Sequence, residues 1–198
     1  MKDFLSVKKR ENFDILLLYY FCKSGERHER NMLQHPVPDQ HLKSIGDITV
    51  SFALLESQIQ SLIGSLLNER QRIGQIITAE LPFKNLIALM ISLYIERHGK
   101  EDADFKKLKG LMTHARQVED KRNQITHSIW GANKDADTIT RIKTRAKEKH
   151  GIRFYFEDTS SDCLADFATE IKVLTEEIQR FWIDLMKNGK AINDHTRQ

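Results

Sequence analysis

Apolar residues recur every three or four positions along most of the chain, which is the spacing of one face of an α-helix. The first such stripe starts after Asp39, a candidate N-cap, and comprises Ile45, Ile48, Phe52, Leu55, Ile59, Leu62 and Leu66. A second helix is expected to open at Pro82 and to close at Gly99, with an apolar stripe made of Phe83, Leu86, Met90, Leu93 and Tyr94. Around Gly74, between these two, the pattern predicts only a short helix or a turn.

Two further helices are predicted in the second half of the chain. One begins near 102–104, and its stripe comprises Phe105, Leu108, Met112, Ala115, Val118, Arg122 and Ile125, so that a charged residue interrupts an apolar face. The last is expected to be capped by Asp162 and to end at Gly189, with the stripe Leu164, Phe167, Ile171, Leu174, Ile178, Phe181 and Leu185.

Between these helices the period changes from 3.6 to 2. Residues 138–147 and 151–157 alternate polar with apolar or small residues, which predicts a β-hairpin with Ile152, Phe154 and Phe156 on one face. The fold class predicted is therefore mainly α: an antiparallel helical bundle of four to five helices, with a small β-hairpin insertion at about 138–157 before the last helix.

The expected domain organisation is an N-terminal arm and linker at 1–38, a bundle at 39–189 and a tail at 190–198. The arm contains the eight-residue apolar run 15–22, which is too short to span a bilayer. No small-residue cleavage site follows the run, so we expect neither a secretory signal nor a membrane anchor, and a cytoplasmic protein.

Composition excludes several classes of function. The 31 Lys and Arg against 28 Asp and Glu leave a formal net charge of only +3, so binding to a polyanion would require a local basic patch. Cys22 and Cys163 form no C-x-x-C pair, and His28, His35 and His41 lack a regular ligand spacing. We therefore expect no metal and no cofactor.

The candidate chemistry lies in segment 119–130, where Arg122 and His127 are separated by four residues. A guanidinium is a fixed positive fork suited to phosphate, and an imidazole can exchange a proton near neutral pH. The same spacing occurs at Arg30 and at Arg145, but the first lies in a predicted loop and the second in a hairpin turn. Only Arg122 lies on the apolar stripe of a predicted helix.

The pattern R-N-x-x-x-H at the end of a helix, within an all-helical bundle, resembles the HEPN superfamily over residues 40–188. The resemblance implies a bundle that dimerises so that two such motifs meet in one groove and, in many members, a metal-independent endoribonuclease of toxin or antiviral systems. It implies that Arg122, Asn123 and His127 are the catalytic residues. We expect Ser128 to support them by positioning groups through hydrogen bonds.

Helix geometry bears on the dimer independently. Five positions at about 100° each place Arg122 and His127 roughly 140° apart on a straight helix, so both reach one phosphate only if the helix ends or bends, or if a second protomer completes the site. We therefore expect a homodimer with its two-fold axis near these residues. Glu56, at the border of the first stripe, either enters this groove as a supporting residue or faces solvent.

A basic face of the hairpin points to RNA as the partner. Odd positions of the hairpin share one side of an extended strand, and this side comprises Arg141, Lys143, Arg145, Lys147, Lys149, Arg153 and Tyr155. The alternative is a solvated strand face that protects an edge from aggregation.

These observations lead to three hypotheses. The first is a dimeric RNA endonuclease that cleaves through attack of the ribose 2′-hydroxyl, with a toxin or phage-defence role. The second is a catalytically silent bundle that holds RNA, a nucleotide or a protein partner. The third is a subunit that docks an antitoxin or a larger complex through residues 1–38.

Overall fold

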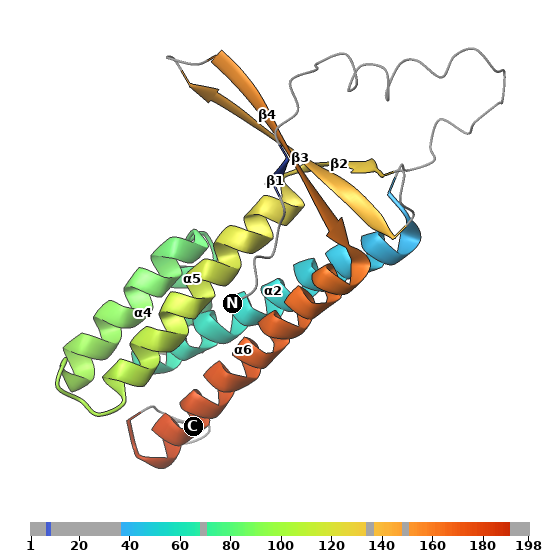
Figure 1. Ribbon diagram of the computed structural model, residues 1–198. Coiled ribbons are helices and arrows are strands. Elements are labelled where there is room, and N and C mark those ends of the chain that lie inside the picture. The colour runs from blue at the N-terminus through green and yellow to red at the C-terminus, as the bar shows by residue number, and fades with distance from the viewer. Residues whose placement is uncertain (1–6, 9–36, 68–70, 134–136, 148–150, 191–198) are drawn as a thin grey trace, which may run out of the picture. The chain divides into compact units, whose positions relative to one another are not determined.

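The computed structural model describes residues 7–8, 37–67, 71–133, 137–147 and 151–190. It contains the helices α2 (Asp39–Leu67), α3 (Gln71–Thr78), α4 (Phe83–His98), α5 (Phe105–Thr126) and α6 (Ser161–Lys187), and a small sheet that precedes α6 (Figure 1). The predicted fold class is confirmed. The predicted docking run at 15–22 lies outside the described residues.

The chain divides into two compact units, whereas a single bundle at 39–189 was predicted. One unit comprises Met1–Ser44 and His127–Leu164 and contains the sheet. The other comprises Ile45–Thr126 and Ala165–Gln198 and contains the helical layers. The long helices α2 and α6 each begin in the first unit and continue in the second.

The helical unit buries the predicted stripes. The first stripe from Ile48 to Leu66 and the last from Phe167 to Leu185 are at most 2% exposed at every predicted position within this unit. Aromatic contacts join the helices, since Phe52 of α2 packs on Phe83 of α4, and Tyr94 of α4 lies near Phe181 of α6. Burial of these faces is the main stabilising contribution.

Local signals set most helix ends. Pro82 is the N-cap of α4, and Gly99 ends it with a φ of 81°, a conformation that glycine adopts without strain. At α6 the predicted cap is wrong: the Ser160 hydroxyl, not Asp162, accepts the hydrogen bond from the backbone N–H of Cys163 at 3.2 Å.

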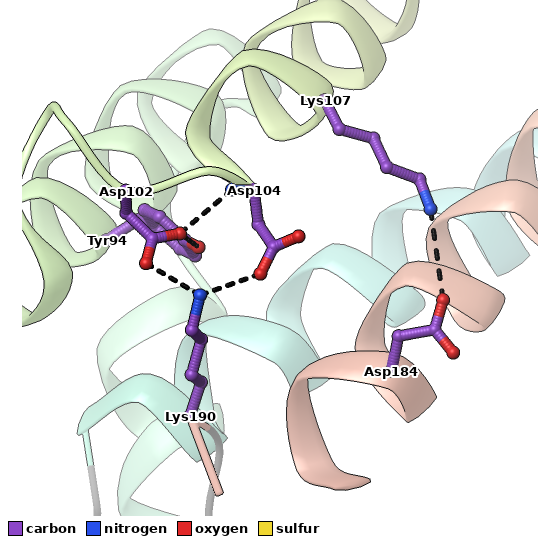
Figure 2. A network of polar contacts seen from close by, with 6 residues as sticks. All are labelled: Tyr94, Asp102, Asp104, Lys107, Asp184 and Lys190. Atoms are coloured by element: carbon purple, nitrogen blue, oxygen red, sulfur yellow. Dashed lines mark hydrogen bonds and ion pairs between the residues drawn. The ribbon is translucent and has the colours of Figure 1, made fainter. Parts of the chain in front are cut away.

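Polar contacts join α4, the loop before α5 and the residue Lys190 at one end of the helical unit (Figure 2). Lys190, just beyond α6, lies 2.6 Å from Asp102 and 2.7 Å from Asp104, both in the loop between α4 and α5. The Tyr94 hydroxyl donates to Asp102 at 2.6 Å. These bonds lower the pKa of Asp102 to about 2, and burial together with that carboxylate raises the pKa of Tyr94. The predicted tail at 190–198 is thus anchored at its first residue.

The sheet has four strands where a hairpin was predicted. Its order is β1 (Val7–Lys8), β4 (Gly151–Ser160), β3 (Thr138–Lys147) and β2 (Ile129–Ala132), and each neighbouring pair is antiparallel. The predicted arm thus contributes an edge strand to the sheet of its own chain.

Among the described residues, one helix, α2, is long and apolar enough to cross a membrane by length and composition, and 44% of its most apolar window is buried in the protein. The core stripe from Ile48 to Leu66 accounts for much of that apolar character.

Candidate functional site

Arg122 lies in the last turns of α5, in a stripe whose apolar members from Leu108 to Ile125 are buried. Its guanidinium carbon is 4.0 Å from the centre of the Phe52 ring on α2, a cation–π contact within the helical unit. Its Nε is buried and has no hydrogen-bond partner among the described residues. The aromatic face thus holds the guanidinium in place, while the Nε–H of Arg122 is left without a hydrogen-bond acceptor among the described residues.

Arg122 forms no ion pair with a described carboxylate. Within the described part of the chain, no carboxylate oxygen lies within 4.0 Å of the Arg122 guanidinium. Burial raises the pKa of Glu119, and the charges of Asp120 and Glu56 add to this effect, which Arg122 opposes. Glu56 is half-buried and acts on Glu119, so the electrostatic neighbourhood of Arg122 is a pair of acids on α2 and α5.

The rest of the motif follows at the end of α5. Asn123 is half-buried, and the Thr126 hydroxyl donates to the carbonyl of Arg122 at 3.0 Å in the last turn. The helix ends at Thr126, as expected, and His127 follows directly with an exposed side chain. Ser128 is half-buried. The chain passes from the helical unit to the sheet unit between Thr126 and His127.

The strands of the hairpin pair so that the predicted basic residues share one face, as expected, but Arg141 is not available on that face to bind RNA. The strands pair Arg141 with Glu157, so the two residues lie on one face of the sheet. Arg141 is 4% exposed and forms an ion pair with Glu157, and Ile139 and Thr159 on the same face are also buried. Here the odd positions are the covered side of the sheet, so Arg141 cannot reach an RNA phosphate.

The remaining basic positions lie farther along the hairpin. Lys143 pairs with Tyr155, and both residues are half-buried. Arg145 pairs with Arg153. The side chains of Arg145, Lys147 and Arg153, and all of Lys149, lie outside the described part of the structure. For these residues, RNA contact stays a prediction.

The apolar face predicted for the hairpin extends across the sheet. Ile129 of β2 pairs with Ile142 of β3, which pairs with Phe156 of β4. Ile129 is 53% exposed and the other two are half-buried, so this face is only partly covered.

Sequence reasoning missed Phe52 as the platform for Arg122. The residue was assigned to the core stripe, and it does lie there at 2% exposure. The one available signal was the charge in the α5 stripe, because a cation in a core-facing phase needs an aromatic or acidic neighbour.

Comparison with protein families, with curated proteins and with solved structures finds no match to this chain. Within the described residues, no group of three or more His, Cys, Asp and Glu side chains is placed to hold a metal ion. The resemblance to the HEPN superfamily therefore stays a prediction that depends on the motif itself.

Proposed function

We propose that this protein is a metal-independent RNA endonuclease of HEPN type, with Arg122 and His127 as its catalytic residues. The observation that carries the proposal is the setting of Arg122: a guanidinium held over Phe52 at 4.0 Å, without an ion-paired carboxylate among the described residues. A structural arginine in a core stripe is ordinarily neutralised by a buried acid. An arginine held on an aromatic ring keeps its charge for an anionic ligand.

The proposed chemistry is transesterification within the RNA strand. The ribose 2′-oxygen attacks the adjacent phosphorus while an imidazole removes its proton, and the bond from phosphorus to the 5′-oxygen breaks as that oxygen gains a proton. His127 would serve as one of these proton carriers and the His127 of a second protomer as the other. Arg122 would stabilise the extra negative charge on the phosphorane, and Asn123 would orient the phosphate by hydrogen bonding. The products are a 2′,3′-cyclic phosphate and a 5′-hydroxyl.

The outer half of the hairpin supports an RNA substrate. The ten residues 143–147 and 151–155 include four basic side chains and no acidic one, and Arg145 is directly opposite Arg153. A run of basic residues without an acidic one is the composition that the phosphate backbone of a nucleic acid attracts. We propose that this segment binds the RNA backbone.

The test is cleavage of end-labelled RNA by the purified protein in excess EDTA. The variants are His127→Ala, Arg122→Ala and, as a matched control, Arg116→Ala, which removes an exposed arginine from the same helix. We expect wild type and the control to cut RNA and both site variants to be inactive while remaining folded by circular dichroism. A 2′-deoxy substitution at the cut site should block cleavage, because the attacking hydroxyl is then absent.

Two results would overturn the proposal. Cleavage that survives in the His127→Ala variant would exclude His127 as a proton carrier. RNA that stays intact but bound, equally in wild type and all variants, would instead establish the alternative of a catalytically silent binding module.

A further inference from the structure

Two carboxylates lie beside the contact between Arg122 and the Phe52 ring. Glu119 is one turn before Arg122 on α5, and Glu56 is one turn after Phe52 on α2. Residues three or four positions apart are neighbours on the surface of a helix. Each helix therefore places one half-buried acid next to the guanidinium.

These two acids are not counter-ions of the arginine. Within the described part of the chain, neither Glu56 nor Glu119 forms an ion pair with any basic residue. A half-buried carboxylate that has no partner is costly in its ionised form, and the usual remedy is a direct pair with a neighbouring cation. Here the acids and Arg122 lie close together without that pair, so the charge of the group depends on protonation.

Charged groups on both helices act on Glu119. Burial raises the pKa of its carboxyl, and the negative charge of the adjacent Asp120 adds to this effect. Arg122 opposes the rise, Glu56 of α2 strengthens it, and Arg116 has the smallest, lowering effect. The pKa of Glu119 therefore lies above its usual value, and this carboxyl takes up a proton at a higher pH than an ordinary glutamate does.

The protonation of Glu119 changes what a phosphate meets at Arg122. An ionised carboxylate repels the phosphate and competes with it for the guanidinium. A protonated carboxyl leaves the positive charge of Arg122 uncompensated, and its O–H can donate a hydrogen bond to a phosphate oxygen. The same site is therefore weak for a polyanion in one state and strong in the other.

We propose that Glu119 is a positioning residue that sets the affinity of Arg122 for an RNA phosphate, so that RNA binds weakly while Glu119 is ionised and tightly once it is protonated. The inference rests on the proposed function, because it requires Arg122 to bind the RNA backbone. Glu56 acts on the same equilibrium, since its negative charge favours the protonated form of Glu119.

The first test measures binding of a fluorescent RNA whose 2′-hydroxyls are methylated, so that it cannot be cleaved. Glu119→Gln removes the charge and keeps nearly the same shape, and near neutral pH it should bind this RNA roughly threefold to tenfold more tightly than wild type. The matched control is Glu101→Gln, the same substitution at an exposed acid in the loop before α5, at the other end of that helix. It should leave the affinity nearly unchanged, because salt screens a charge at that distance.

The pH dependence of binding is a readout that a merely structural role would not change. As the pH falls from about 7.5 to about 5, wild type should gain more affinity than Glu119→Gln; histidines gain protons in both proteins, so the difference between them is the measurement. Glu56→Gln removes one of the charges that raise the pKa of Glu119. Its gain in affinity should therefore move to lower pH.

A double variant shows whether Glu119 acts through Arg122. In the Arg122→Ala background, Glu119→Gln should no longer tighten binding. If Arg122→Ala alone binds RNA as tightly as wild type, the arginine is not a phosphate ligand and the proposed function fails together with this inference. If Arg122→Ala weakens binding but Glu119→Gln binds no more tightly than Glu101→Gln, or gains equally without Arg122, only this inference is overturned.

Discussion

The glycine contact between α2 and α3 predicts that one substitution has opposite effects at two helical positions. Gly74 lies in α3, and a Cβ added to it would meet the Cα of Gly64 at 2.8 Å. Gly110 lies in α5, where an added Cβ would meet nothing within 4 Å. The substitutions Gly74→Ala and Gly110→Ala therefore add the same methyl group to a helical backbone. At Gly74 the methyl group meets the backbone of α2, and at Gly110 it meets nothing within 4 Å.

The expected magnitudes follow from two contributions. Replacing glycine by alanine inside a helix stabilises it by about 1 kcal/mol, because less backbone entropy is lost on folding. At Gly110 this gain is the whole effect. At Gly74 the methyl group must push α3 away from α2, and forcing a methyl group into a packed contact costs about 1–3 kcal/mol. We expect Gly74→Ala to be neutral to about 2 kcal/mol destabilising, and the two variants to differ by about 1–3 kcal/mol.

Urea unfolding followed by circular dichroism measures the difference directly. Gly64→Ala provides an internal control, because a Cβ there would lie 3.8 Å from the Cα of Gly74, an ordinary van der Waals distance. It should therefore be tolerated, although Gly64 faces the same crossing. The reasoning is refuted if Gly74→Ala gains as much stability as Gly110→Ala, because α3 would then not be held by a close backbone contact.

Three further substitutions test the polar groups of the fold. Lys190→Met removes the main cause of the lowered pKa of Asp102, the hydrogen bond from the Lys190 ammonium. Because that pKa is about 2 against an ordinary 3.8, wild type should lose about 1–2 kcal/mol of stability as pH falls from 5 to 2, and the variant less, in acid titrations followed by circular dichroism. Arg141→Met leaves the Glu157 carboxylate without its buried partner and should lower the free energy of unfolding in urea by about 3–5 kcal/mol. Stability should recover when Glu157→Leu is added, and an equal loss in the double variant would contradict this. His41→Leu should raise the melting temperature, because the imidazole is 2% exposed and neither ring nitrogen is bonded to a described residue; a lower melting temperature would show that those nitrogens have a partner.

The helical part of the fold was predictable because helix formation depends on local sequence. The stripes of α2, α4, α5 and α6 repeat every three or four residues, and caps such as Gly99 act within one turn. The candidate motif was found for the same reason, since Arg122 and His127 are five positions apart. The strand β2 was missed because its four residues, Ile-Trp-Gly-Ala, show no alternation of polar and apolar types.

Which face of the sheet is buried could not be predicted from local patterns. Alternation correctly predicted which positions of the hairpin share a face, but it assigned the basic side to solvent, whereas Arg141 and Ile139 on that side are buried. A period of two says that two faces differ, not which of them the rest of the protein covers. That choice depends on residues distant in sequence, here Glu157, whose carboxylate allows Arg141 to be buried as an ion pair.

Local sequence was enough to predict the order and phase of the long helices, the pairing of the central hairpin and the position of the motif at a helix end, because each depends on neighbours within a few residues. Which charges are neutralised depends instead on contacts between segments that are distant in sequence. Arg141 is neutralised by Glu157, whereas Arg122 is held by the ring of Phe52, a residue 70 positions away. It also decided that α3 turns its isoleucines outward, because the closest approach between α2 and α3 leaves room only for glycine at Gly74. Packing between distant segments, which no local pattern records, thus determined the setting of Arg122, on which we base the proposed function.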